Sequence, residues 1–151
     1  MNFEYKEDEI YFARLICQSG ETIEKYENLF DFRPLKVKRK EFNIIRNNIY
    51  NGLVKKYGKV CFLSYNGICD TESGFAIDHV IPLSTNKLNK EIRNFKSEKG
   101  KKVKTQSFGS NHPDNLILAC NKCNSFKKHK ILDKDHINLI ISSIKKLLKN
   151  N

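Results

Sequence analysis

Two stretches decide the fold of this chain: Ile77-Asp78-His79-Val80-Ile81-Pro82, and then Asn115-Leu116-Ile117-Leu118-Ala119-Cys120-Asn121-Lys122-Cys123-Asn124-Ser125-Phe126-Lys127. The apolar runs within 74–79 and 115–120 are of strand length and predict a pair of strands. A helix is expected to follow at once, over 121–131. The sequence therefore predicts an α+β protein in which two strands lead directly into a helix.

The polar residues of these stretches have the chemistry of a hydrolytic site. A histidine whose pKa is near neutral can take a proton from water, so His79 is the candidate general base. Oxygen ligands from Asp78 and Asn124 suit a hard cation such as Mg²⁺ or Mn²⁺. Neighbouring residues of a regular strand point to opposite faces, so a bend at the strand end is needed for Asp78 and His79 to reach one phosphate. Asn115 can bond to the backbone of the loop that carries both.

The order Asp-His-x-Ile-Pro, Asn-Leu and Cys-x2-Cys-Asn-x2-Lys resembles the HNH nucleases over residues 60–130. The resemblance implies a ββα-metal core, here with a helical N-terminal extension and a C-terminal helix. It implies that Asp78 and Asn124 hold the catalytic metal ion and that His79 activates water. It also implies that Asn115 braces the loop and that Lys127 steadies a phosphate. Asn124 stands where the family name has histidine, as in the nuclease domain of RNA-guided CRISPR effectors.

The activity that this resemblance implies is metal-dependent hydrolysis of phosphodiester bonds in double-stranded DNA. A restriction-type double-strand cutter is the first expectation, and a homing or phage endonuclease is the second. Cutting both strands with one site per chain calls for a homodimer or two successive nicks. The alternative from another class is a zinc-stapled DNA-binding module without catalysis, and RNA stays open as a substrate because the motif does not itself contact the 2′-hydroxyl.

The cysteines predict a structural zinc site. Cys120 and Cys123 form a Cys-x2-Cys pair, whereas the residue three positions after Cys61 is Ser64. Asn66-Gly67, between two apolar runs, predicts a type I′ hairpin that places Cys69 opposite Ser64. The expected zinc ligands are therefore Cys61, Cys69, Cys120 and Cys123, with buried or free thiols as the alternative.

The remaining elements are read from periodicity and capping. Residues 1–36 are expected to form a helical N-terminal extension, with helices over 6–17 and 21–30. Residues 37–151 would form the nuclease domain, beginning with a helix over 38–57 whose basic face is either solvated or in contact with DNA. Asp133 and Asp135 can cap a last helix with an apolar face made of Ile137, Ile140, Ile141, Ile144 and Leu148.

Charge is distributed unevenly along the chain, whose formal net charge is +11. Residues 1–33 carry 8 acidic and 4 basic side chains, so the remainder has a balance of +15 and favours a polyanionic partner. The insert between the two motif halves, 84–112, is rich in lysine. We expect Lys99, Lys101, Lys102 and Lys104 to bind DNA, with a solvated loop as the alternative.

The cellular location is inferred from the N-terminus and from cysteine usage. The first residues are acidic, where a signal peptide would be cationic and then apolar, and no run approaches the roughly 20 apolar residues of a spanning helix. We therefore expect a cytoplasmic protein without a membrane partner. The other histidines, His112, His129 and His136, are most simply explained by a turn, a basic stretch and a helix start.

Overall fold

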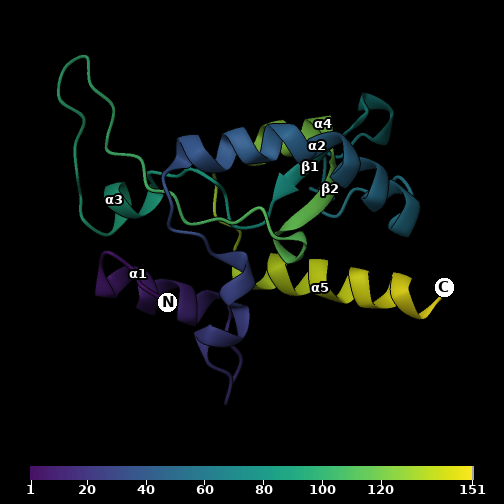
Figure 1. The fold of residues 1–151 in the computed structure, drawn as a ribbon, viewed down its shortest axis with the longest axis horizontal. Coiled ribbons are helices and arrows are strands. Elements are labelled where there is room, and N and C mark those ends of the chain that lie inside the picture. The colour runs from purple at the N-terminus through teal and green to yellow at the C-terminus, as the bar shows by residue number, and fades with distance from the viewer. Residues whose placement is uncertain (151) are drawn as a thin grey trace.

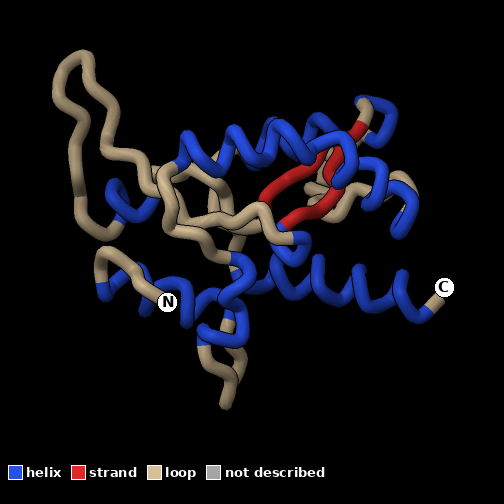
Figure 2. The backbone as a smooth tube through the Cα atoms, viewed as in Figure 1, coloured by secondary structure: helices blue, strands red, loops and turns tan. Residues whose placement is uncertain are grey.

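The computed structural model describes residues 1–150 and has an α+β architecture built around a small antiparallel sheet (Figures 1 and 2). Strand β1 (Phe75–His79) pairs with β2 (Leu116–Cys120), from Phe75 opposite Cys120 to His79 opposite Leu116. Helix α4 (Asn121–Lys127) follows β2 directly. The predicted strand, strand and helix are confirmed, but α4 ends earlier than expected because Lys128 adopts a φ of 51°.

Two long helices lie on either side of the sheet. In Figure 1, α2 (Leu35–Tyr57) runs above the sheet and α5 (Lys134–Lys149) runs below it. The side chain of Asp133 caps α5 by accepting a hydrogen bond from the His136 N–H at 2.8 Å, as the sequence predicts. The apolar face of α5 is partly different from the prediction, since Leu148 is exposed and Leu147 packs against the core. Leu147 lies three residues after Ile144 and Leu148 lies four residues after it, and either spacing can continue one face of a helix. Here the three-residue position faces the core.

The N-terminal segment packs against the rest of the chain through aromatic residues. Helix α1 (Lys6–Ile16) places Phe12 with its ring 5.1 Å from Phe30 and 5.0 Å from Phe108, and Phe12 belongs to the same buried core as Leu118 of β2. The helix predicted over 21–30 forms over a shorter range and as a 3-10 helix, η1 (Ile23–Leu29), because Tyr26 leaves helical geometry with φ of −107° and ψ of 17°.

The predicted type I′ hairpin at Asn66-Gly67 is wrong. A turn does form, with the Ile68 N–H donating to the Tyr65 carbonyl at 3.1 Å. Gly67 has a positive φ of 72° but Asn66 does not, whereas a type I′ turn requires it at both central residues. The flanking residues form no ladder because their backbone is used elsewhere: the Phe62 N–H donates to Leu118 O of β2 at 2.9 Å.

The insert 84–112 is anchored at both ends and projects between them. It contains the short helix α3 (Lys87–Glu91), and isolated bridges join Thr85 to Gln106 and Phe30 to Gly109. The buried Asp8 carboxylate of α1 accepts hydrogen bonds from Arg93 at 2.6 Å and from Gln106 at 3.0 Å. Residues 94–102 are exposed and form the long loop at the upper left of Figure 1.

Two short 3-10 helices, η2 (Thr71–Ser73) and η3 (Pro113–Asn115), lead into β1 and β2. None of the helices within residues 1–150 combines the length and the apolar character that crossing a membrane requires.

Candidate active site and cysteine cluster

A cavity of about 300 Å³ at the end of β1 brings Asp78, His79 and Asn124 together. The strand ladder is regular through His79, and the chain bends at Val80 and Ile81, immediately after it. The bend therefore lies at the strand end, where the sequence requires it. The remaining lining residues come from α2, from the segment after β1 and from the end of α4: Arg39, Phe42, Asn43, Ile77, Pro82, Leu83, Ser84, Lys128 and His129.

Lys127 lies away from this cavity and contacts the Asp78 carboxylate. Its side chain is fully buried, with Nζ 3.1 Å from Asp78 Oδ1, 2.8 Å from Oδ2 and 2.7 Å from the His79 carbonyl oxygen. Burial raises the pKa of Asp78, and the nearby Lys127 ammonium opposes that shift. Lys127 thus fixes α4 to the end of β1, which differs from the expected contact with substrate phosphate. Oδ2 has no partner with hydrogen-bond geometry within residues 1–150.

His79 has a hydrogen bond that the sequence does not predict. Its Nε2 lies 2.9 Å from Oδ1 of Asn111, which is near the end of the insert. The ring of Phe42 packs edge-on against the imidazole, with centroids 4.8 Å apart. Burial lowers the pKa of His79 to about 4, and the hydrogen bond with Asn111 only partly offsets it. The imidazole is therefore neutral at neutral pH, as a general base must be before it accepts a proton, but its pKa is lower than the near-neutral value expected from the sequence, because the side chain is buried.

Asn115 makes the contacts expected of a bracing residue. Its fully buried side chain accepts a hydrogen bond from the Ile81 N–H at 2.8 Å and donates to Ile81 O at 3.0 Å and Ser110 O at 2.9 Å. Its carbonyl oxygen also accepts from the Val80 N–H at 2.9 Å. The bend that follows His79 is therefore held by one side chain, which also ties it to the end of the insert.

Basic side chains from separate elements meet at the rim of the cavity. Arg39 of α2 donates from Nη2 to Ser84 Oγ at 3.4 Å, and Ser84 Oγ lies 3.3 Å from Nδ1 of His129. Arg39 and His129 are exposed, so their cationic or hydrogen-bonding groups are accessible to a ligand. The sequence places His129 only in a basic stretch, and its position at the rim follows from the way Lys128 ends α4.

Sulfur atoms of Cys61, Cys69, Cys120 and Cys123 form a cluster in which all ligand atoms lie within 4.8 Å of one another. Tetrahedral coordination by thiolates at a Zn–S distance of about 2.3 Å places sulfurs about 3.8 Å apart. The 4.0 Å between the Cys69 and Cys120 sulfurs is close to that spacing. The sequence predicts this set correctly, although Cys69 arrives through the turn at Gly67 and not through a hairpin.

Backbone N–H groups point at two of these sulfurs and favour the thiolate of Cys120. N–H groups of Asp70 and Cys123 point at the Cys120 sulfur from 3.4 and 3.3 Å, and the Ser64 N–H lies 3.4 Å from the Cys61 sulfur. Burial opposes ionisation of Cys120, but these two N–H donors, together with the neighbouring thiols, outweigh it and lower the pKa of Cys120 to about 6. Burial raises the pKa of Cys123. The four sulfurs form a donor set that could hold a metal ion.

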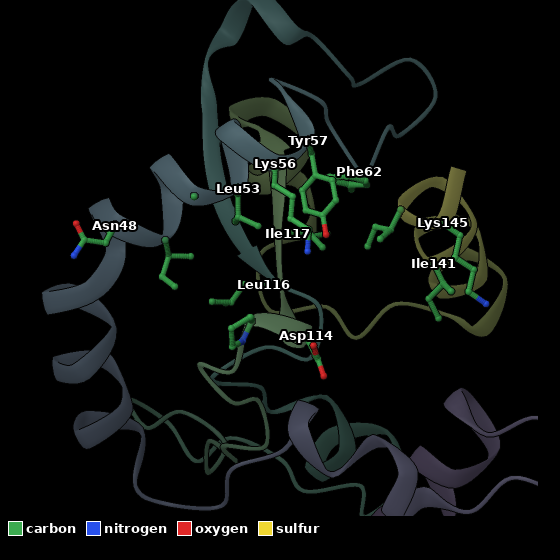
Figure 3. Close-up of a pocket in the computed structure, with 14 residues that line it drawn as sticks. Asn48, Leu53, Lys56, Tyr57, Phe62, Asp114, Leu116, Ile117, Ile141 and Lys145 are labelled. Atoms are coloured by element: carbon green, nitrogen blue, oxygen red, sulfur yellow. The ribbon is translucent and has the colours of Figure 1, made fainter. Parts of the chain in front are cut away.

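A second cavity, of about 500 Å³, lies between α2 and α5 and is more apolar (Figure 3). Leu53 and Tyr57 of α2 lie on one side of it and Ile141 of α5 on the other, with Ile117 of β2 between them. It contains none of the residues predicted to carry chemistry. The lysines predicted to bind DNA lie elsewhere too, exposed on the insert, where Lys101 pairs with Glu98 and Lys104 with Glu4.

No known family model matches the chain, and neither a curated protein nor a solved structure shows significant similarity to it. The functional interpretation consequently depends on the site itself.

Proposed function

We propose that this protein is a metal-dependent endonuclease of the HNH type that hydrolyses phosphodiester bonds in double-stranded DNA. The observation that carries the proposal is the convergence of Asp78, His79 and Asn124 on one cavity at the junction of β1 and α4. The cavity joins a candidate base to oxygen donors, and its rim is basic. Phosphodiester hydrolysis requires a proton acceptor for the attacking water and positive charge near the phosphate. The candidate base supplies the first, and the basic rim and an ion held by the oxygen donors would supply the second.

Asp78 and Asn124 fit a Mg²⁺ or Mn²⁺ ion by their donor chemistry. Both offer oxygen atoms, and Asp78 Oδ2, which accepts no hydrogen bond of good geometry among the described residues, would share its charge between the ion and the Lys127 ammonium 2.8 Å away. Mg²⁺ commonly takes only one or two protein carboxylates and completes its shell with water and substrate phosphate. When bound, the ion supplies positive charge for the phosphate and the leaving oxygen.

The side chains of the cavity divide the remaining work. His79 accepts the proton of a water molecule that attacks phosphorus in line with the 3′ oxygen. The P–O3′ bond breaks and the leaving 3′ oxygen takes a proton from solvent water, so the products are a 5′-phosphate and a 3′-hydroxyl. Arg39 and His129 are placed to contact phosphate oxygens at the rim. Asn115 keeps the bend after His79 in place.

The experiment that tests this proposal compares wild type with His79→Ala on plasmid DNA in the presence of Mg²⁺, Mn²⁺ or EDTA. Loss of the general base is expected to lower the cleavage rate at least ~10²-fold while DNA binding and the melting temperature are retained. His112→Ala is the matched control, because this exposed residue caps η3 and lies outside the cavity. Cleavage by His79→Ala at the wild-type rate would refute the assignment. Discrete fragments would favour the restriction-type role. A smear of fragments would indicate a non-specific nuclease.

We also propose that Cys61, Cys69, Cys120 and Cys123 hold one structural Zn²⁺. The support is the sulfur cluster and its N–H donors. Such a metal would join the loop before β1 to the start of α4, which carries Asn124.

A second candidate function is a zinc-stapled DNA-binding module without catalysis. The observation that favours it is the buried pair of Lys127 and Asp78, since an internal ammonium already neutralises the carboxylate. Intact plasmid together with a gel shift in the cleavage experiment would select this candidate.

A further inference from the structure

The orientation of the Asn111 amide determines which nitrogen of His79 carries the proton. Asn111 Nδ2 donates to the carbonyl oxygen of Lys38 at 2.9 Å. The other end of the amide, Oδ1, is therefore the atom that faces His79 Nε2 at 2.9 Å. A carbonyl oxygen can only accept, so Nε2 must be the donor. In the neutral imidazole, Nδ1 then keeps a free lone pair.

The support behind Asn111 is rigid. Lys38 is fully buried in the first turn of α2, and its Nζ donates to the carbonyl oxygens of Gly109, at 2.7 Å, and of Asp31. Lys38 thus holds the end of the insert two residues before Asn111, while its own carbonyl oxygen holds the Asn111 amide. Phe42, one helical turn further along α2, packs on the imidazole. One helix therefore restrains both Asn111 and the ring that Asn111 contacts.

Asn111 acts from outside the cavity. It is absent from the residues that line the cavity, whereas His79 is among them. We propose that Asn111 is a positioning residue that holds His79 in the tautomer with Nε2 protonated, so that Nδ1 is the nitrogen that takes the proton from water. The inference deepens the proposed nuclease function and rests on it for the role of Nδ1.

Nitrogen NMR of the full chain tests the tautomer directly. With histidine labelled by ¹⁵N in the ring, the His79 signals are assigned by their absence in His79→Ala. At neutral pH we expect a protonated Nε2 and an unprotonated Nδ1, with an Nε2–H proton protected from exchange with water. A proton on Nδ1, or an Nε2–H in fast exchange, would overturn the inference.

Substitutions at Asn111 test the positioning role. Asn111→Ala is expected to lose the protected proton and to lower kcat roughly 10- to 100-fold, the usual effect of removing a partner of this kind. KM should change little because Asn111 lies outside the cavity. Asn111→Asp keeps an acceptor for Nε2–H but loses the donor to the Lys38 carbonyl oxygen, so it should restore the protected proton and part of kcat. Asn47→Ala, an exposed asparagine of α2, is the control and should match wild type.

The outcomes separate the two proposals. An Asn111→Ala variant with wild-type kcat and an intact protected proton would show that Asn111 has no positioning role. The wild-type spectrum decides the tautomer even where that variant fails to fold. Unchanged cleavage by His79→Ala would instead remove the nuclease proposal, and the spectrum would still report whether Asn111 fixes the proton on Nε2.

Discussion

At the scale of single residues, the site depends on buried charges that face each other. Asp78 and Lys127 are almost completely removed from water, and each is the neutralising partner of the other. A buried pair adds little stability compared with apolar residues, but removing one partner leaves an uncompensated charge. The contact also fixes the last turn of α4 against the carbonyl oxygen of His79. The pair therefore controls the shape of the cavity as well as its charge.

We predict that Lys127→Met lowers the free energy of unfolding by about 3–5 kcal/mol, because Asp78 stays buried without its partner. Urea unfolding measures this loss. The double variant with Asp78→Asn should recover most of it. Lys122→Met, which removes an exposed partner of Asp70 from the same helix, is the control and should cost less than about 1 kcal/mol. Equal losses in the two single variants would show that the buried pair is not special.

At the scale of elements, the cysteine cluster connects segments that share few backbone hydrogen bonds. Cys61 and Cys69 lie on the loop before β1, Cys120 ends β2, and Cys123 lies in the first turn of α4. The loop has no ladder of its own and is attached to β2 through Phe62. A metal held by these four sulfurs would order the loop and the start of α4 together. The stability of both elements should therefore depend on it.

We predict one tightly bound Zn²⁺ per chain, measured by elemental analysis of freshly purified protein. Cys120→Ser should lower the zinc content and the melting temperature together, since metal binding and folding are coupled. Activity should fall only as the fold is lost, in contrast to His79→Ala. Cys17→Ser is the control, because Cys17 lies outside the cluster, and it should keep its zinc. If a zinc-free preparation of the protein melted at the same temperature as the zinc-bound protein, the structural role of the metal would be refuted.

At the scale of the whole molecule, the acidic N-terminal segment and the basic remainder of the chain differ in charge but share one core. The acidic N-terminal segment packs into the common core and, through Asp8, anchors the base of the basic insert. The insert tip is left exposed, with lysines whose pairs with Glu98 and Glu4 lie at the surface and contribute little. Such lysines are available to exchange their partners for phosphates, with release of counterions from DNA.

We predict that changing Lys99, Lys101, Lys102 and Lys104 together to Gln weakens DNA binding and flattens its dependence on salt. The slope of log K against log [salt] should fall by roughly 0.9 for every phosphate that the insert no longer neutralises. The quadruple change of Lys134, Lys145, Lys146 and Lys149 to Gln is the control, because it removes the same charge from exposed positions on α5, outside the insert. Equal slopes for the two variants would mean that the insert is merely solvated.

The sequence by itself determined the features that depend on neighbouring residues. Apolar runs of strand length gave the strands that end at His79 and Cys120, capping gave the start of α5 at Asp133, and Cys-x2-Cys spacing gave half of the cysteine cluster. Each of these is set by local geometry, which a pattern of a few residues encodes.

Only the tertiary structure decided which groups are buried and which distant side chains meet. The motif suggested a phosphate contact for Lys127, but its side chain satisfies Asp78 because both are removed from water. Asn111 reaches His79 from another part of the chain and is itself held by the Lys38 carbonyl oxygen, and neither contact leaves a local pattern. The turn at Asn66 departs from its strong local preference because its neighbours pair with β2 and with sulfur. Desolvation and long-range hydrogen bonding are properties of the folded chain. They determine the chemistry of residues such as Lys127 and His79, which the identity of those residues alone does not determine.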